Sequence, residues 1–203
     1  MNKRKIIFFS TGRADFYLLS LIYKKFKKNK KFKSYLVATG NHYEIDKGQT
    51  YKEILKKGFK IDFKVPYNLK NDTKKEIIYE ISKSIKKNFN ILNKIKPDLI
   101  LILGDRYEIF GAAVTATCLA MPIAHIHGGE ITQGANDDAM RHAITKLSHI
   151  HFVAAEQYAR RVIQMGENPA QVYNVGALGV ENVLKLPFLE KADLERELGF
   201  HFK

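Results

Sequence analysis

The sequence predicts an α/β protein, a doubly wound parallel sheet of Rossmann-like type with helices on both faces. Three observations predict it. Short apolar runs alternate with longer amphipathic segments along the chain, as in successive strand–helix–strand units. Residues 98–103 are almost entirely apolar, which is expected of a strand buried on both faces. Residues 73–95 repeat apolar side chains at spacings of three and four, which predicts a long helix.

The first elements follow from their apolar patterns. Residues 5–10 and 32–38 are short apolar runs and are predicted as strands. Between them, residues 15–28 carry apolar side chains at helical spacing among lysines, which predicts an amphipathic helix. Residues 50–57 predict a short helix, and residues 61–65 predict a weak strand.

The later elements include the longest helix of the chain. Its apolar face consists of Ile77, Ile78, Ile81, Ile85, Phe89, Leu92 and Ile95. Spacings of three and four mark one face of a long helix, and Pro97 ends the helix. Further helices are predicted at 107–119, 137–148 and 156–165, and further strands at 98–103, 122–126, 150–154 and 172–175.

Length and composition bound the domain organisation of the 203-residue chain. Residues 1–185 predict one Rossmann-like domain, and residues 186–203, with Pro187, predict a connecting segment. No apolar run approaches the ~18 residues of a membrane span, and the start lacks the apolar region of a secretory signal. We therefore expect a cytoplasmic protein without a membrane partner. A single cysteine, Cys118, excludes an internal disulfide and a cysteine-based zinc site.

The net charge of +13 is unevenly distributed. Residues 1–97 hold 25 Lys and Arg against 8 Asp and Glu, whereas residues 98–203 hold 9 against 13. The excess is almost all lysine on helix faces, without interleaved aromatic platforms and with few arginines. This distribution predicts a solvated surface and no nucleic-acid partner.

Polar, glycine-containing loops follow four of the predicted strands, and ligands of open parallel sheets bind at the carboxyl ends of strands. The first loop, Ser10-Thr11-Gly12-Arg13-Ala14-Asp15, combines a glycine turn, a helix start and an arginine, which suits an anion. Its simpler interpretation is a turn at Gly12 with Asp15 as helix cap. In the second loop, Thr39-Gly40-Asn41-His42, His42 either faces the same cleft or is an exposed loop histidine.

The third loop, Gly104-Asp105-Arg106-Tyr107-Glu108, places a carboxylate and a guanidinium directly after a buried strand. Alternatively, Asp105 caps the next helix while Arg106 pairs with Glu108. The fourth region is the richest in titratable groups, with His125, His127, Gly128, Gly129, Glu130, Asp137, Asp138, Arg141 and His142. Groups of this kind on one loop and one helix are typical of a tuned acid–base site.

Spacing makes specific predictions for this fourth region. His125 and His127 lie two residues apart and on a strand would share one face. At a helical spacing of four, Asp137 pairs with Arg141 and Asp138 pairs with His142. A rival interpretation is a metal site, for which the credible ligands are His125, His127, Glu130 and His142. Their spacing matches none of the helix-borne zinc motifs, so we predict neither a metal nor a cofactor.

Three stretches resemble the hydrolysing UDP-N-acetylglucosamine 2-epimerases. They are Thr11-Gly12-Arg13-Ala14-Asp15, Gly104-Asp105-Arg106-Tyr107-Glu108 and residues 125–152, with a close match in Arg141-His142-Ala143-Ile144-Thr145-Lys146-Leu147-Ser148-His149. The resemblance covers about residues 5–184 and is strongest to the branch that makes precursors of sialic, legionaminic and related nine-carbon sugars. It implies the N-terminal domain of a glycosyltransferase-B-type fold, with residues 186–203 leading toward a second domain.

The resemblance also implies a reaction, in which UDP is eliminated from a UDP-sugar to leave a glycal and water then adds with inversion at carbon 2. By motif, Arg13 would contact the diphosphate, Asp105 and Asp137 would be the acid–base carboxylates, and Arg141 and His142 would orient them or the substrate. The predicted catalytic residues are Asp105, His127, Glu130, Asp137, Arg141 and His142. The predicted substrate-binding residues are Thr11, Gly12, Arg13, His42, Arg106, Gly128 and Gly129.

Two departures from the family pattern bear on the substrate. His127 stands where several members of the branch are expected to carry a glutamate, and one extra residue separates Glu130 from Asp137. UDP-diacetylbacillosamine is therefore at least as suitable a substrate as UDP-N-acetylglucosamine. A histidine at position 127 can also carry a proton near neutral pH.

Family members are about twice as long, and their second half supplies most contacts to the nucleotide. We therefore expect this chain to fold but to turn over no substrate alone, and the complete protein to be a dimer or tetramer. Two alternatives remain open, namely half of a glycosyltransferase-B-type glycosyltransferase and a non-catalytic nucleotide-sugar binding module.

Overall fold

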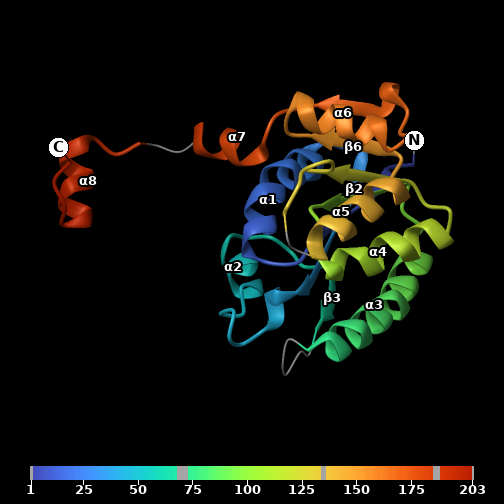
Figure 1. Cartoon of the computed structure of the whole chain (residues 1–203). Helices are drawn as coiled ribbons and strands as arrows, with labels where there is room; N and C mark the ends of the chain where they lie inside the picture. The colour runs from blue at the N-terminus through green and yellow to red at the C-terminus, as the bar shows by residue number, and fades with distance from the viewer. Residues whose placement is uncertain (1, 68–72, 134–135, 185–187, 203) are drawn as a thin grey trace.

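The computed structural model describes residues 2–67, 73–133, 136–184 and 188–202 (Figure 1). It contains one sheet of seven parallel strands in the order β3-β2-β1-β4-β5-β6-β7, which confirms the predicted doubly wound architecture. The strands are β1 (Arg4–Ser10), β2 (Phe32–Gly40), β3 (Phe63–Pro66), β4 (Leu99–Leu103), β5 (Ile123–Ile126), β6 (Ile150–Val153) and β7 (Val172–Asn174). The helices are α1 (Arg13–Lys28), α2 (Tyr51–Lys56), α3 (Lys74–Ile95), α4 (Tyr107–Cys118), α5 (Asn136–Leu147), α6 (Glu156–Gln164), α7 (Leu178–Leu184) and α8 (Lys191–Leu198).

Helices cover both faces of the sheet because its central strands are apolar on both sides. In β1, Ile7 and Phe9 face the layer that contains α3, α4 and α5, whereas Ile6 and Phe8 face the layer that contains α1 and α2. Each layer buries its own apolar cluster, and a smaller third cluster lies under α6. The sheet is therefore a rigid support from which the loops after its strands project.

The order of the strands reverses direction between β1 and β4. From β1 the chain moves outward to β2 and β3, and after β4 it moves outward on the other side to β7. The loops after β1 and β4 consequently diverge, which leaves room for a ligand at the carboxyl ends of these strands. The loops after β1 and β4 are the first and third of the four polar loops identified in the sequence, and both lie at this point.

The longest predicted helix is present as α3, and only part of its apolar face is buried. Thr73 caps α3 by accepting the backbone N–H of Glu76 at 3.3 Å, and α3 ends before Pro97 as expected. Ile78 and Phe89, however, lie on the outside, whereas polar side chains face α4. The apolar face of α3 that the spacing predicted is therefore buried only in part.

Several smaller elements were not predicted, namely α7 and the short 3₁₀ turns at Asn41–Tyr43 and Pro169–Gln171. The segment predicted to connect to a second domain contains α8, and the proposed domain boundary at 185/186 lies outside the described residues. Within the described part of the chain, none of the helices combines the length and apolar character that a bilayer span needs.

Candidate active site

A cationic cleft of about 320 Å³ opens where the strand order reverses. Its lining residues are Thr11, Gly12, Arg13, Ala14, Asp15, Asn41, Lys47, Thr50 and Arg106. Arg13 stands at the first turn of α1, and Gly12 precedes it in extended conformation. The helix N-terminus adds its partial positive charge to the three cations of the cleft, so the cleft is suited to a bound anion.

Asp15 is the acidic side chain of this cleft, and its surroundings hold it in place. Its carboxylate accepts hydrogen bonds from the backbone N–H of Thr11 at 3.2 Å and from the Thr11 hydroxyl. Burial raises the pKa of Asp15, while the bonds from Thr11 and the charge of Arg106 oppose that rise. From the sequence, Asp15 was considered only as a helix cap, and Lys47 was not predicted because it lies in a loop without a pattern.

His42 lies beneath the cleft and does not line it. Its Nε2 hydrogen-bonds the Ser10 hydroxyl and its Nδ1 hydrogen-bonds the Thr50 hydroxyl, both at 2.8 Å. Burial lowers the pKa of His42 to about 4, so the ring is neutral at physiological pH. The sequence analysis offered two interpretations of His42, a residue facing the cleft and an exposed loop residue. Neither agrees with this placement, because hydrogen bonds to the two hydroxyl groups hold the ring in the interior.

The Arg106 guanidinium forms a bidentate ion pair with Glu108, whose closest N–O distance is 2.7 Å. The Glu108 side chain is fully buried. Burial raises its pKa, and the charge of Arg106 opposes the rise. Gly40, which ends β2 at φ +56°, packs against the same carboxylate, since a Cβ there would lie 2.6 Å from Oε1. The pairing predicted as an alternative for Arg106 is therefore present, while Arg106 also lines the cleft.

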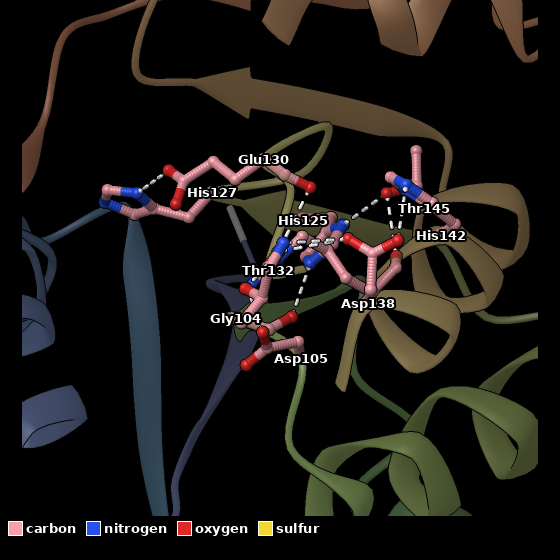
Figure 2. A network of polar contacts seen from close by, with 10 residues as sticks. Gly104, Asp105, His125, His127, Glu130, Thr132, Asp138, His142 and Thr145 are labelled. Carbon is pink, nitrogen blue, oxygen red and sulfur yellow. Dashed lines mark hydrogen bonds and ion pairs between the residues drawn. The ribbon is translucent and has the colours of Figure 1, made fainter. Parts of the chain in front are cut away.

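Asp105 follows β4 (Figure 2), and Arg141 of α5 holds its carboxylate in an ion pair. Arg141 also donates to the backbone carbonyl of Glu130 and to the Thr132 hydroxyl, both at 3.0 Å. Asp105 does not cap α4, because Arg106 is the capping residue and makes no side-chain cap bond. Burial raises the pKa of Asp105, Arg141 opposes the rise, and the nearby charge of Asp137 adds to it.

The helical pairs of α5 differ in part from the spacing prediction. His142 Nε2 lies 3.6 Å from Asp138, as expected. Arg141, however, pairs with Asp105 and lies 3.9 Å from Asp138, so the predicted Asp137–Arg141 pair is wrong. Asp137 is exposed at the start of α5. Arg141 reaches across to β4 because a buried guanidinium gains more from an equally shielded carboxylate than from an exposed one.

His125 and His127 do not share a face, because β5 ends at Ile126. His127 has a positive φ of +65° and leaves the strand period. Figure 2 shows the two rings apart, with His127 beside Glu130 and His125 near Gly104 and Thr145. Burial lowers the pKa of His125 to about 4, although its bond to the Gly104 carbonyl opposes the shift. His125 is therefore a neutral structural histidine.

His127 and Glu130 form a tight pair, with 2.5 Å between Nδ1 and Oε1. Burial disfavours the charge of Glu130, but the hydrogen bond and charge of His127, aided by Arg141, outweigh it and lower the pKa of Glu130. Gly129, at φ +77°, must be glycine, since a Cβ would lie 2.5 Å from the Tyr158 carbonyl of α6. The double glycine thus lets the loop fold back tightly enough for this pair to form.

The described residues contain no group of three or more His, Cys, Asp or Glu side chains arranged to hold a metal ion. Ion pairs join Asp105, Arg141, Asp138 and His142 into one polar network, and the charge of the exposed Asp137 acts on Asp105 from nearby. Thr11, Gly12, Arg13 and Arg106 line the neighbouring cleft. Asp15 connects the two regions, because it lines the cleft and its charge reaches Asp105.

Comparison with known proteins identifies the family of the chain. Residues 24–200 match the family model described as UDP-N-acetylglucosamine 2-epimerase. The chain belongs to the UDP-N-acetylglucosamine 2-epimerase family. It corresponds to the N-terminal half of the family's hydrolysing members.

Two curated 2-epimerases are similar over almost the whole chain. The GDP/UDP-N,N'-diacetylbacillosamine 2-epimerase (hydrolyzing) of Campylobacter jejuni is 40% identical over 198 residues, which are 98% of this chain and 51% of the relative. The UDP-N,N'-diacetylbacillosamine 2-epimerase (hydrolyzing) of Legionella pneumophila is 34% identical over 97% of this chain and 52% of its own length. The chain thus spans about half the length of these 2-epimerases.

A solved 2-epimerase shares the fold. The UDP-GlcNAc 2-epimerase of Neisseria meningitidis, bound to UDP-GlcNAc, superposes with a TM-score of 0.77 at 19% identity, over 96% of this chain and 51% of that structure. The sheet and its flanking helices therefore form a Rossmann-like domain of the glycosyltransferase-B-like fold.

Proposed function

We propose that this chain forms the N-terminal half of a hydrolysing nucleotide-sugar 2-epimerase, which converts a UDP-linked N-acetylated sugar into its free 2-epimer and UDP. One observation carries the proposal: a shielded carboxylate, Asp105, is fixed by Arg141 at the switch point, next to a cleft lined by cations. An elimination of a diphosphate needs both a placed proton carrier and positive charge for the leaving group. Family membership supports the same reaction.

The cationic cleft would take the diphosphate. Arg13 offers a planar donor fork, and Lys47 and Arg106 add charge. As the bond between carbon 1 and the UDP oxygen breaks, negative charge grows on that oxygen. Cations already in place stabilise this charge without having to reorganise.

The carboxylates would move the protons. In the first step one carboxylate takes the proton from carbon 2 while UDP leaves carbon 1, which gives a glycal. In the second step water adds its oxygen to carbon 1, and a proton returns to carbon 2 from the opposite face. Asp105 and Asp137 suit these tasks, because their surroundings differ: Asp105 is shielded with a raised pKa, whereas Asp137 is exposed.

His127 and Glu130 would serve this chemistry from the β5 loop. The hydrogen bond between His127 Nδ1 and Glu130 fixes the orientation of the imidazole ring. The other ring nitrogen, Nε2, is buried without a protein partner in the described part of the chain. Gly128 and Gly129 have packing reasons to be glycine, and contact of their backbone with the sugar remains a prediction. His142 would orient the start of α5 through Asp138.

We infer a UDP-linked diacetamido sugar of the diacetylbacillosamine type as substrate, since the two similar curated relatives carry that name. UDP-N-acetylglucosamine is the comparison substrate. The product would enter synthesis of legionaminic or sialic acid-type sugars in the cytoplasm, and the complete enzyme would be a homo-oligomer.

The decisive experiment compares this chain alone with the same chain joined to the C-terminal half of the Campylobacter jejuni relative. UDP release is measured with both UDP-sugars in heavy water, and carbon 2 of the product is examined for deuterium. We expect release with deuterium at carbon 2 from the joined protein and no turnover from the chain alone. UDP release that needs an acceptor sugar and leaves carbon 2 unlabelled would instead indicate a glycosyltransferase. UDP binding without turnover by the joined protein would indicate a binding module.

A further inference from the structure

A second cavity, of about 230 Å³, lies beside the end of α1. Eight residues line it, and the five lysines among them are Lys24, Lys27, Lys28, Lys57 and Lys60. The first three lie on α1 at spacings of three and four, so they share one face of that helix. The other two follow the end of α2. Two segments that are distant in the chain therefore present ammonium groups to one space, which we call the lysine cavity.

The lysine cavity is separate from the cationic cleft, and the two share no lining residue. Arg13, in the first turn of α1, lines the cleft, whereas Lys27 and Lys28 stand in its last turn. With 16 residues at 1.5 Å per residue, α1 is about 24 Å long. A ligand of the lysine cavity is therefore additional to an anion bound in the cleft.

Carboxylates leave most of this positive charge uncompensated. Among the described residues, Lys60 is the one lysine of the five with an ion pair, at 3.6 Å from Asp62, and Asp62 also accepts a backbone N–H of β2. Lysines in the last turn of a helix interact favourably with its negative end, which accounts for Lys27 and Lys28. It does not account for Lys24, which lies before that turn, or for Lys60, which lies beyond α2. The lysines repel one another across the cavity, and a bound anion would remove that repulsion.

A neighbouring cavity adds to the positive potential at this end of α1. Its volume is about 310 Å³, its described lining residues include no carboxylate, and its cations are Lys3, Arg4, Lys30 and Lys31. Lys30 and Lys31 follow directly after α1. Concave surfaces lined by one sign of charge focus the electric field and raise the local concentration of counter-ions. This end of the molecule therefore attracts multiply charged anions.

A buried hydroxyl in the wall of the lysine cavity lacks a hydrogen-bond partner. Tyr23 lines the cavity, is 4% exposed, and packs its ring against Phe8 and Phe59. Its hydroxyl has no partner in the part of the chain that the structure describes, although buried polar groups are nearly always paired. Burial raises the pKa of Tyr23 to about 12, so the hydroxyl keeps its proton as a donor. An anion in the cavity would supply the acceptor that this donor lacks.

The size and the side chains of the lysine cavity indicate the kind of ligand. The cavity is smaller than the about 300–1,000 Å³ typical of pockets for drug-sized molecules, which favours a compact ligand. Its cations are all lysines, which bind phosphate groups as point charges. Single-stranded nucleic acid would need accessible aromatic faces for its bases, but Tyr23 is buried and Phe59 is only 7% exposed.

We propose that the lysine cavity binds a compact polyphosphate, either inorganic or part of a small organic molecule, and that the Tyr23 hydroxyl donates a hydrogen bond to it. The lysines of α1 and of the segment after α2 would neutralise the phosphate groups from two sides. A lipid headgroup shares the phosphate chemistry. A bilayer, however, would present its phosphates as a flat layer at the rim of the cavity and leave the buried Tyr23 hydroxyl without an acceptor. We therefore expect a ligand that is free in solution.

Calorimetric titration of the chain with inorganic triphosphate tests the proposal. Every protein carries Arg13→Ala, which weakens competing binding at the cleft. We expect binding at one site, and the double variant Lys27→Gln/Lys57→Gln should weaken it about tenfold or more, because two charge-assisted contacts are lost. The matched control is Lys75→Gln/Lys86→Gln, which removes the same charge from exposed positions of α3 in the opposite layer. The control should change the affinity by less than about twofold, since distant exposed charges are screened by salt.

Tyr23→Phe is a second test that removes no charge. It should weaken triphosphate binding about threefold to tenfold, because the donor to the anion is lost. Circular dichroism checks that all variants fold, and Tyr23→Phe decides the question if the lysine variant does not. Failure of the chain to bind triphosphate overturns the proposal, as does an affinity that Tyr23→Phe leaves unchanged. Equal losses in the two lysine double variants also overturn it, because they would mean that net charge alone attracts the anion.

A vesicle experiment separates the two sources of phosphate. Vesicles of phosphatidylglycerol and phosphatidylcholine are sedimented with the chain and with Lys27→Gln/Lys57→Gln. We expect neither protein to sediment with the vesicles at about 0.15 M salt, where the Debye length is about 8 Å. Vesicle binding that the lysine variant abolishes, together with no binding of free triphosphate, would assign the lysines to a membrane surface and overturn the proposal.

Discussion

The cleft beside β1 and the polar network beside β5 lie at the same edge of the sheet, but their charges differ. Arg13, Lys47 and Arg106 line the cleft, with Asp15 as its acid. In the network, Arg141 is surrounded by the carboxylates of Asp105 and Asp138. In the proposed function, the first region holds an anion, and the second provides carboxylates in unequal surroundings for proton transfer. The difference indicates that binding and proton transfer can be altered separately.

The largest expected effect tests the acidic region. Asp105→Asn in the joined two-domain protein should lower kcat by about 10²–10⁴-fold, because an amide cannot carry the proton. The affinity for UDP should stay within about threefold, because the cationic cleft remains intact. Initial rates and calorimetric UDP titration measure the two quantities. Asp98→Asn, at the amino end of the same strand, is the control, and a loss of kcat below about threefold would reduce Asp105 to a structural residue.

The second prediction concerns the pH dependence of folding stability. Each region contains a buried, neutral histidine, which is His42 at the cleft and His125 at the polar network. Burial lowers the pKa of His42 and of His125 to about 4 from the ordinary 6.5. The unfolded chain binds these protons more readily, so stability is present above pH 6.5 and is lost as pH falls toward 4. Each histidine should remove about 3 kcal/mol from the free energy of unfolding across that range.

Urea unfolding at about pH 7 and about pH 4.5 measures this loss. Asp15, Asp105 and Glu108 have raised pKa values and act in the opposite direction. The readout is therefore the difference between the original chain and His42→Asn, which should be less stable at neutral pH but lose less on acidification. Equal losses in both proteins would mean that His42 does not contribute to the acid sensitivity.

A smaller effect tests the cationic region. Arg13→Ala should weaken UDP binding by about tenfold or more, as expected for loss of a charge-assisted hydrogen bond to phosphate. KM should rise by a similar factor while kcat changes less, which is the reverse of the Asp105 result. Arg160→Ala on the exposed face of α6 is the matched control. If Arg13→Ala lowered kcat and left UDP affinity unchanged, the division between the two regions would be wrong.

The smallest effect concerns Glu130 as a positioning residue for His127. Glu130→Gln keeps the shape of the acceptor but removes its charge, so the 2.5 Å bond to Nδ1 becomes an ordinary one. We expect kcat to fall about threefold to tenfold, with a shifted pH profile and unchanged UDP affinity. Glu156→Gln on α6 is the control. An unchanged pH profile would contradict the positioning role.

Most of the fold was predictable because it depends on repeated patterns. The apolar runs of β1 and β4 and the helical spacing between them determine a parallel sheet with a switch point. A pattern does not tell which part of a helix face is buried. Gly111 draws Ser84 inward and turns Phe89 outward on α3. The spacing of residues within α3 cannot predict this contact, because Gly111 belongs to another helix, α4.

The candidate site shows the same limit. The loops that contain Arg13 and Asp105 were found from their place after strands. The pairing of Arg141 with Asp105, 36 residues away, was missed because local spacing offered Asp137 at four residues. The end of β5 at Ile126 likewise separated His127 from His125. Long-range ion pairs and strand ends are decided by tertiary packing, which short spacings do not encode.

Gly40 couples the packing of two loops that are far apart in the chain. It has no side chain where the Glu108 carboxylate lies, and Glu108 in turn fixes Arg106 at the cleft. A larger residue at position 40 would push Glu108 aside and release Arg106 from its place. Exchanging either loop alone for that of a distant homologue should therefore damage anion binding, and function should return only when both are inherited together.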